Sequence, residues 1–301
     1  MYPGYLNLSK KESNQRIEKL FKILENCEVC PRKCHLNRLK NKKGFCLLGY
    51  LPTVSAFHPH FGEENVLVGS RGSGTIFFTS CNLACVYCQN YEISQLRIGE
   101  KISFERLAEM MIELRNKGCH NINLVSPTSH VPAIVKALFI AREQGLKLPL
   151  VYNTNAYDSV ETLKLLDGIV DIYMPDAKYS DDKIALKYSN APKYYEIMKK
   201  AIKEMYRQVG DLMINKEGIA VRGLLVRHLV LPNNLAGTEE IVEFLAKEIS
   251  QNTFLNIMDQ YYPYFKANQY SELSRRITNE EYLQAVNLAK KAGLKRLYPY
   301  L

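Results

Sequence analysis

The chain has 301 residues, of which 47% are hydrophobic and 24% are charged. This is the composition of an ordinary globular protein with one large or two small domains. The N-terminal sequence lacks the apolar core of a signal peptide, and no apolar run is long enough to cross a bilayer, so we expect a cytoplasmic protein without a membrane partner. The formal charge is +9, but the basic residues are scattered along the chain, which argues against a nucleic-acid partner.

The apolar pattern predicts a helix over residues 9–26, followed by four closely spaced cysteines and by short strands and loops over residues 49–74. From residue 75 onward, short apolar runs alternate with helical patterns. Strands are expected at residues 75–79, 121–125, 148–152, 169–174, 224–231 and 254–258. Helices are expected at residues 104–114, 131–139, 159–166, 194–209 and 238–249, and a capping box at Thr278-x-x-Glu281 opens a last helix that ends near Gly293.

Six strand–helix units in succession predict an α/β fold with a parallel sheet and right-handed crossovers. Eight such units would close a full barrel, so six favour a partial, TIM-like (β/α)6 barrel. We expect this barrel over residues 71–301 and a small, metal-stapled extension over residues 1–70. In folds of this kind the active site lies at the carboxyl ends of the strands.

Three cysteines follow the first predicted barrel strand in the spacing C-x3-C-x2-C: Cys81, Cys85 and Cys88. Three thiolates can bind three irons of a [4Fe–4S] cluster and leave the fourth iron open for chemistry. The alternative is a structural zinc site that His58 or His60 completes.

Four further cysteines lie within residues 27–46, and Cys119 stands alone: Cys27, Cys30, Cys34 and Cys46. Clustered cysteines in a cytoplasmic chain indicate metal binding rather than disulfides. Zinc would staple the extension, whereas a second iron–sulfur cluster would relay electrons. The spacing does not separate these two interpretations.

The segment TSCNLACVYCQN around the three cysteines resembles the signature of the radical S-adenosylmethionine (SAM) enzymes. Over nearly the whole chain, the sequence resembles the pyruvate formate-lyase activating enzyme group, and most closely its PflX-type branch with an N-terminal four-cysteine motif. The matching segments are CEVCPRKC, FHPHFGEE, NINLVSPTSHVP, VYNTNAY, DIYMPDAKYS, LLVRHLVLP and NIMDQYYP.

The resemblance implies an oxygen-sensitive oxidoreductase that binds a [4Fe–4S] cluster and SAM and cleaves SAM to a 5′-deoxyadenosyl radical. It also implies a reductant such as flavodoxin or ferredoxin, and a glycyl radical enzyme as the protein substrate. The alternatives are radical modification of another protein, peptide or small molecule, and a non-catalytic iron–sulfur or zinc-ribbon binding protein.

The same resemblance implies a set of residues that contact SAM: Tyr87, Asn90, Ser126, Thr128, Asn153, Asn155, Asp176, Lys178, Arg227 and Gln260. Ser126-Pro127-Thr128 stands where relatives carry Gly-Gly-Glu, so hydroxyls or backbone carbonyls would bind the SAM ammonium there. Asp176 and Lys178 are alternatively an ordinary ion pair, and Glu63 and Glu64 belong either to a solvated turn or to the pocket. The tyrosines of residues 261–264 are candidates for a peptide groove.

Overall fold

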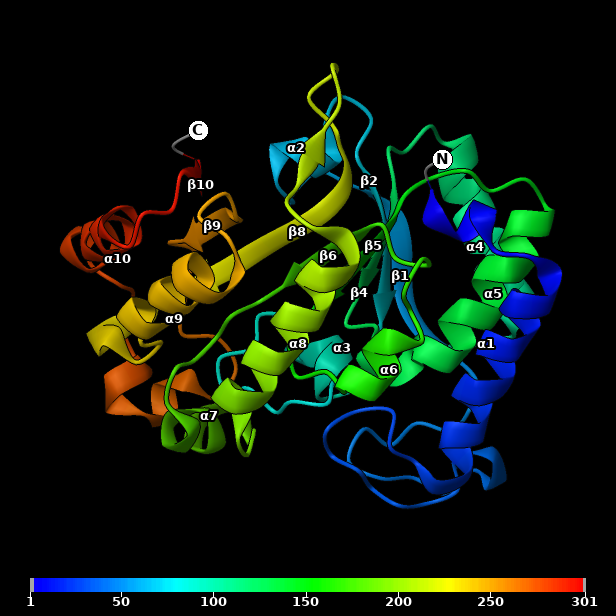
Figure 1. Cartoon of the computed structure of the whole chain (residues 1–301). Helices are drawn as coiled ribbons and strands as arrows, with labels where there is room; N and C mark the ends of the chain where they lie inside the picture. The colour runs from blue at the N-terminus through cyan, green and yellow to red at the C-terminus, as the bar shows by residue number, and fades with distance from the viewer. Residues whose placement is uncertain (1–2, 300–301) are drawn as a thin grey trace.

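A largely parallel sheet forms the centre of the computed structural model, which describes residues 3–299. Its parallel strands are β2 (Ser73–Phe78), β4 (Ile122–Val125), β5 (Leu150–Thr154), β6 (Ile172–Pro175), β8 (Ala220–Leu229) and β9 (Phe254–Met258). They lie side by side in this order, and the sheet ends in two separate edges, so it does not close (Figure 1). The predicted α/β class and its six parallel strands are confirmed.

A seventh parallel strand, β10 (Arg296–Tyr298), pairs with β9. The expectation that residues 254–258 form the last strand is therefore wrong, whereas the last helix ends at Lys291, close to the predicted Gly293. The strand has only three residues, too few for an alternating pattern to be recognised.

Two strands extend the sheet on the other side of β2. β1 (Thr53–His60) pairs antiparallel with β2, and β3 (Glu100–Lys101) pairs antiparallel with β1. β1 lies within the extension expected over residues 1–70, and α1 (Lys10–Ile23) of the same segment packs on α5 (Val131–Glu143). The division of the chain at residue 70 stays a prediction.

Helices cover the outer face of the sheet (Figure 1). Besides α1 and α5, they include α4 (Phe104–Asn116), α6 (Val160–Lys164), α7 (Asp182–Ser189), α8 (Tyr194–Val209), α9 (Thr238–Phe244) and α10 (Asn279–Lys291). The predicted capping box is present at the start of α10, where Thr278 and Glu281 each bond the other's backbone N–H. α3 (Tyr91–Ser94) follows the cysteine loop.

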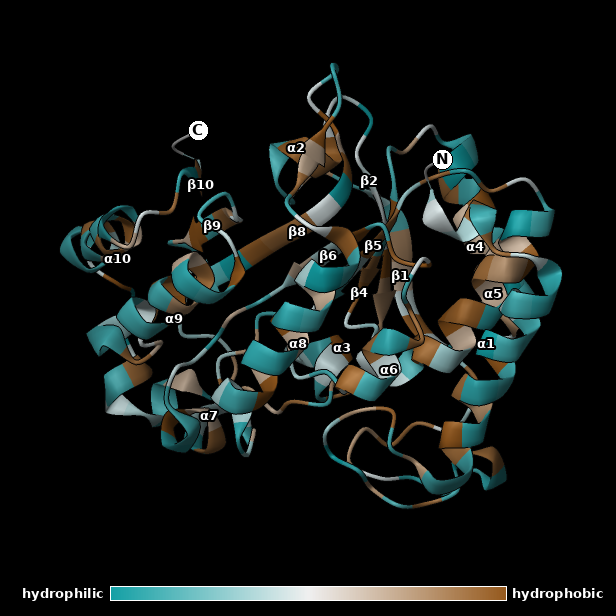
Figure 2. Cartoon of the chain, viewed as in Figure 1, coloured by the Kyte–Doolittle hydropathy of each residue, from teal (hydrophilic) through white to brown (hydrophobic). Residues whose placement is uncertain are grey.

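The two faces of the sheet bury different apolar clusters, because successive side chains of a strand point to opposite sides. On one face the strands pack against the helices, whose inner sides are apolar (Figure 2). On the other face Val151, Ile172, Leu225 and Phe254 pack with Leu67 of α2 (Asn65–Val68). α2 lies beside the short hairpin of β7 (Met213–Ile214) and β8 in Figure 1.

No helix among residues 3–299 is long and apolar enough to cross a membrane.

We predict that Phe254→Ala lowers the free energy of unfolding by about 3–5 kcal/mol, because it leaves a cavity in the apolar cluster that Phe254 forms with Val151, Ile172, Leu225 and Leu67. Phe254 is fully buried, whereas Leu283 on α10 is 53% exposed and Leu283→Ala is the control. Urea unfolding of both variants measures the difference. Equal stability of the two variants would contradict this account of the core.

Candidate active site at the carboxyl ends of the strands

The three cysteines after β2 open onto a cavity of about 570 Å³. Polar side chains from the ends of the neighbouring strands line the same cavity. Nine of the ten predicted SAM contacts are among them: Tyr87, Asn90, Ser126, Asn153, Asn155, Asp176, Lys178, Arg227 and Gln260. The sheet brings these residues together because the carboxyl ends of parallel strands meet at one edge.

Thr128 is the predicted contact that does not line this cavity. Its hydroxyl group donates to Asp158 at 2.8 Å and lies 3.2 Å from the Thr154 hydroxyl group. Tyr152 donates to the same Asp158 carboxylate at 2.9 Å. Thr128 is 3% exposed, and its hydroxyl group stabilises the end of β5 outside the cavity.

Hydrogen bonds fix the sulfur atoms of the cysteine loop. Asn155 Nδ2 lies 3.2 Å from Cys81 Sγ, and Ser189 Oγ lies 3.0 Å from Cys85 Sγ. Cys88 Sγ lies 3.2 Å from Ser94 Oγ. Burial raises the pKa of the Cys85 thiol to about 12 and that of Cys81 to about 11, against the opposing effect of Lys178. A bound metal centre would favour the thiolate form of both cysteines.

The donor set of the cavity includes three thiols and two imidazoles. His58 and His60 line the same cavity as the three cysteines, and both imidazole rings pack on Phe77. The alternative zinc site with His58 or His60 stays a prediction. A cubane cluster binds each thiolate at a different iron, so three thiols that share one cavity fit it.

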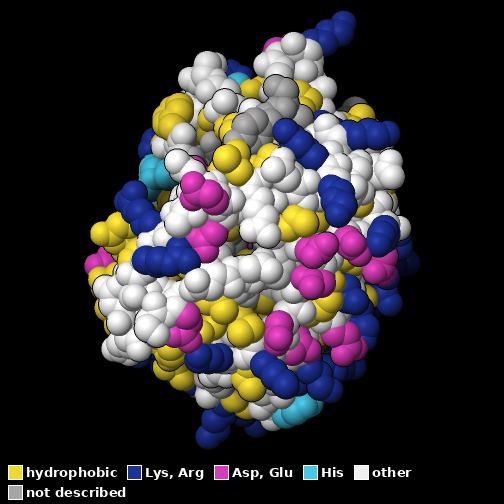
Figure 3. Space-filling model, turned by 90° about the vertical axis from the view of Figure 1, so that its left-hand side faces the viewer, with side chains coloured by type: hydrophobic (Ala, Val, Ile, Leu, Met, Phe, Trp, Pro, Cys, Tyr) yellow, Lys and Arg dark blue, Asp and Glu magenta, His cyan; other side chains and the backbone are white. Residues whose placement is uncertain are grey.

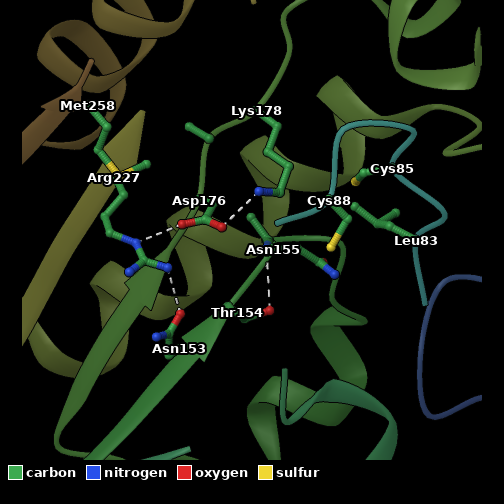
Figure 4. Close-up of polar contacts among 12 residues, drawn as sticks. Leu83, Cys85, Cys88, Asn153, Thr154, Asn155, Asp176, Lys178, Arg227 and Met258 are labelled. Atoms are coloured by element: carbon green, nitrogen blue, oxygen red, sulfur yellow. Dashed lines mark hydrogen bonds and ion pairs between the residues drawn. The ribbon is translucent and has the colours of Figure 1, made fainter. Parts of the chain in front are cut away.

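A row of alternating charges crosses the cavity from Glu63 to Lys178. Figure 4 shows its part from Arg227 through Asp176 to Lys178. Glu63 Oε2 lies 3.0 Å from Arg227 Nη1, and Arg227 Nε lies 2.7 Å from Asp176 Oδ1. Asp176 Oδ2 in turn lies 2.8 Å from Lys178 Nζ. The side chain of Arg227 is 16% exposed and that of Glu63 is 8% exposed, and such buried charges are stable only when each is paired.

The pKa values of the two carboxyl groups follow from this row. Burial raises the pKa of Glu63, and Arg227 opposes that effect. Burial acts in the same direction on Asp176, but Arg227 and Lys178 hold its pKa below the usual range. Asn153 accepts a hydrogen bond from Arg227 at 2.7 Å and donates to Glu63 at 3.3 Å, so it fixes the geometry of the pair.

Glu63 is the residue of this site whose role the sequence left open. It precedes α2 and lies 164 positions from Arg227. The FHPHFGEE segment was the available signal, but it did not separate a solvated turn from a pocket residue. The adjacent Glu64 is 3% exposed and accepts a hydrogen bond from Asn256 on β9.

The side chain of Tyr87 connects the cysteine loop to the protein interior. Its hydroxyl group lies 2.5 Å from that of Tyr179, which in turn lies 2.7 Å from Ser189 Oγ. Ser189 makes the contact to Cys85 described above, so the chain of hydrogen bonds ends at a cluster ligand. Neither residue was predicted from the sequence. Tyr179 lies in the DIYMPDAKYS segment but had no assigned role, and Ser189 lies 104 positions from Cys85 and belongs to no quoted segment.

The four N-terminal cysteines, together with Arg32 and Asn82, line a small pocket of their own. These cysteines are Cys27, Cys30, Cys34 and Cys46. Arg32 Nε donates to the Asn82 carbonyl at 2.9 Å, and Asn82 is the residue after Cys81. The segment of the N-terminal cysteines thus contacts the loop that carries Cys81. The four thiols share one pocket, and four thiolates are a ligand set for either zinc or an iron–sulfur cluster.

Comparison with known proteins gives a family and two relatives. A family model described as the Radical SAM superfamily matches residues 75–218. The uncharacterized protein MJ0674 of Methanocaldococcus jannaschii is 35% identical over 94% of this chain and 80% of its own length. The uncharacterized protein MJ0808 of the same organism is 28% identical over 93% of this chain and 82% of its own length.

Solved structures share the fold at low sequence identity. HydG, described as a maturase of the [FeFe]-hydrogenase, has a TM-score of 0.51 and 11% identity over 97% of this chain and 64% of its own. Native anSMEcpe with bound AdoMet has a TM-score of 0.50 and 13% identity over 71% of this chain and 57% of its own. The chain spans less than two thirds of the length of either structure, and the likeness supports the partial-barrel fold alone.

We predict that Arg227→Met lowers the free energy of unfolding by about 3–5 kcal/mol at neutral pH, because it leaves the buried Glu63 carboxylate without its cation and removes one of the two cations that contact Asp176. Arg227 lowers the pKa of both carboxyl groups, so both pKa values are expected to be higher in the variant than in the wild type. The loss should therefore be full near pH 7 and shrink as the pH falls below about 4, through the lowered pKa of Asp176 in the wild-type protein, because both groups are then protonated with or without Arg227. Urea unfolding at several pH values measures it.

The control for this variant is Lys200→Met, which breaks an ion pair with Glu196 whose side chains are 63% and 56% exposed. An exposed pair contributes at most about 1 kcal/mol. An Arg227→Met variant as stable as this control, or one whose loss does not depend on pH, would contradict the paired-charge account.

Proposed function

Because the chain belongs to the radical SAM superfamily, we propose that it binds SAM in the strand-end cavity and acts on a protein substrate at the mouth of that cavity. The observation that carries the proposal is the position of Cys81, Cys85 and Cys88. They follow directly after β2 and line one cavity with polar residues from the ends of the other strands. The protein is a radical SAM enzyme in which this cavity is the reaction site.

In this proposal Cys81, Cys85 and Cys88 hold three irons of a [4Fe–4S] cluster and leave one iron open. When bound, the cluster supplies the electron that cleaves SAM to methionine and a 5′-deoxyadenosyl radical. The protein side chains hold SAM in place and keep water away from the reaction site.

Lys178 and Arg227 are the cations of the cavity, and we assign them to the carboxylate of SAM. The SAM ammonium group needs an acceptor, and no acidic residue follows β4 at Ser126-Pro127-Thr128. Ser126 lines the cavity, and Asp176 contributes a carboxylate that already binds the Lys178 ammonium group. We propose that these two residues replace the missing glutamate, with Tyr87, Asn90, Asn153, Asn155 and Gln260 as further SAM contacts.

Activation of a glycyl radical enzyme is the finer proposal for the reaction. The motifs shared with the pyruvate formate-lyase activating enzyme group support it. A reductant such as flavodoxin or ferredoxin would deliver the electron in the cytoplasm. The second candidate is radical modification of another protein or peptide, and the exposed tyrosines beside the cavity favour a polypeptide in either case.

For the N-terminal cysteines we propose a second metal site that positions the catalytic loop. The hydrogen bond from Arg32 to the residue after Cys81 supports this role. Zinc would make the site a structural staple, whereas a second iron–sulfur cluster would lie next to the catalytic one and relay electrons to it.

We predict that the protein, reconstituted with iron and sulfide without oxygen and reduced with dithionite, converts SAM to 5′-deoxyadenosine. Cys85→Ala should abolish the product because it removes one cluster ligand. Cys119→Ala is the matched control, since Cys119 is buried outside the cavity. Chromatography of the quenched reaction measures the product. A wild-type protein with a full cluster and no product would overturn the proposed function.

Metal analysis of Cys85→Ala separates the two interpretations of the N-terminal site. We predict that this variant retains the metal bound by the N-terminal cysteines, and that Cys30→Ala loses it and also binds the catalytic cluster less well. Elemental analysis gives zinc or iron directly, and acid-labile sulfide identifies a cluster. A Cys30→Ala variant with unchanged metal content would rule out the second site.

A further inference from the structure

A second cavity, of about 400 Å³, lies next to the reaction cavity. The two cavities share Gln89 of the cysteine loop and Gln260 after β9. Gln89 Nε2 donates to the Gln260 carbonyl at 3.2 Å, so these two residues form the partition between them. The remaining wall comes from residues 259–264 and from the segment that leads into α10. The second cavity therefore extends the reaction cavity toward the surface.

The wall of this second cavity is attached directly to the cysteine loop. Lys266 N–H donates to the Val86 carbonyl at 2.8 Å. The ring of Phe265 stacks on Tyr91 with centroids 4.9 Å apart, and the ring of Tyr261 meets Tyr87 edge to face at 5.7 Å. A molecule held by this wall is thus held in a fixed position relative to the cluster ligands.

Two exposed tyrosines and one arginine form the mouth of the second cavity. Tyr262 and Tyr264 are 41% and 42% exposed, and their ring centroids lie 4.8 Å apart. The guanidinium group of Arg276 lies 4.7 Å from the centroid of the Tyr262 ring. Within residues 3–299 no carboxylate pairs with Arg276, although its neighbour Arg275 is bound by Glu281 and Asn233. A guanidinium group that has no carboxylate partner can bind the carboxylate of an incoming ligand.

The remaining lining suits a polypeptide. Gln89, Gln260 and Asn279 present amide groups that can donate to and accept from a peptide backbone. Asp259 is the one acidic residue of the lining and supplies an acceptor for backbone N–H groups. Over the face that carries α9 and α10, acidic and basic side chains lie interspersed with hydrophobic ones (Figure 3). Recognition there depends on single side chains rather than on a large charged field.

We propose that this second cavity is the docking site for the substrate, and that the substrate is a polypeptide segment with an acidic side chain. Its carboxylate pairs with Arg276 while the tyrosine rings pack along the chain, and the residue to be modified reaches past Gln89 and Gln260 into the reaction cavity. The proposal rests on the proposed function, since it assigns the substrate class of the same site. A small molecule that fits the reaction cavity alone would not use this wall.

Binding of defined peptides tests the proposal. The probes are three fluorescein-labelled nonapeptides of Gly, Ser and Ala that carry Asp, Asn or Lys at the centre. Anaerobic fluorescence anisotropy with the SAM-loaded holoenzyme should give a dissociation constant about tenfold lower for the Asp peptide than for the Asn peptide, as one charge-assisted contact predicts. Arg276→Gln should remove this difference, and Arg275→Gln, which removes the adjacent charge outside the cavity, should retain it.

Three results would each overturn the docking proposal. The first is a wild-type protein that does not distinguish the three peptides, and the second is an Arg276→Gln variant that still distinguishes them. The third is binding of N-acetylaspartate amide as tight as that of the Asp peptide, which would mark a site for small acids. Formation of 5′-deoxyadenosine without peptide is measured in parallel and should be equal in wild type and Arg276→Gln. If the wild-type protein forms no 5′-deoxyadenosine but still binds the Asp peptide more tightly than the Asn peptide, the proposed function fails and the docking site stands.

Discussion

Pairing of buried charges is the constraint on which the strand-end cavity depends. Glu63, Arg227, Asp176 and Lys178 alternate in sign, and each lies within 3.0 Å of its neighbour in the row. A single unpaired member would cost several kcal/mol in this environment. The row therefore fixes the relative positions of the segment before α2, the end of β6 and the carboxyl-terminal part of β8. A cavity built in this way presents two cations to a ligand without leaving either of them unpaired when the ligand is absent.

The cysteine loop depends on a second set of contacts. Tyrosine and serine hydroxyl groups connect Tyr87 to Cys85 inside the protein, and Arg32 connects the N-terminal cysteines to the residue after Cys81. The loop has no regular secondary structure, and these side chains hold it together with backbone hydrogen bonds such as that from Val86 N–H to the Tyr188 carbonyl at 2.8 Å. Both the proposed second metal site and the proposed docking wall contact this loop, and either one would influence how the catalytic ligands are placed.

The sequence predicted the parts of this protein that are set by local patterns. Apolar runs located the six parallel strands, and the Thr278–Glu281 pair located the start of α10. The spacing of Cys81, Cys85 and Cys88 placed the candidate site at the end of the first of those strands. Strand β10 was not predicted because three residues are too few to show an alternating apolar pattern. Thr128 was assigned to the cavity because its motif does not reveal that its hydroxyl group binds Asp158. Contacts between distant segments, such as Glu63 with Arg227, have no local signal at all.

The central claim of the proposed function is that SAM binds in the strand-end cavity next to the iron left open by Cys81, Cys85 and Cys88. Electron–nuclear double resonance on the reduced holoenzyme, with SAM labelled with ¹⁵N in its amino group and ¹⁷O in its carboxylate, tests it most directly. The account predicts hyperfine coupling of both labels to the cluster in wild type and in Cys119→Ala. A reduced, intact cluster that shows neither coupling in the presence of saturating SAM would contradict it.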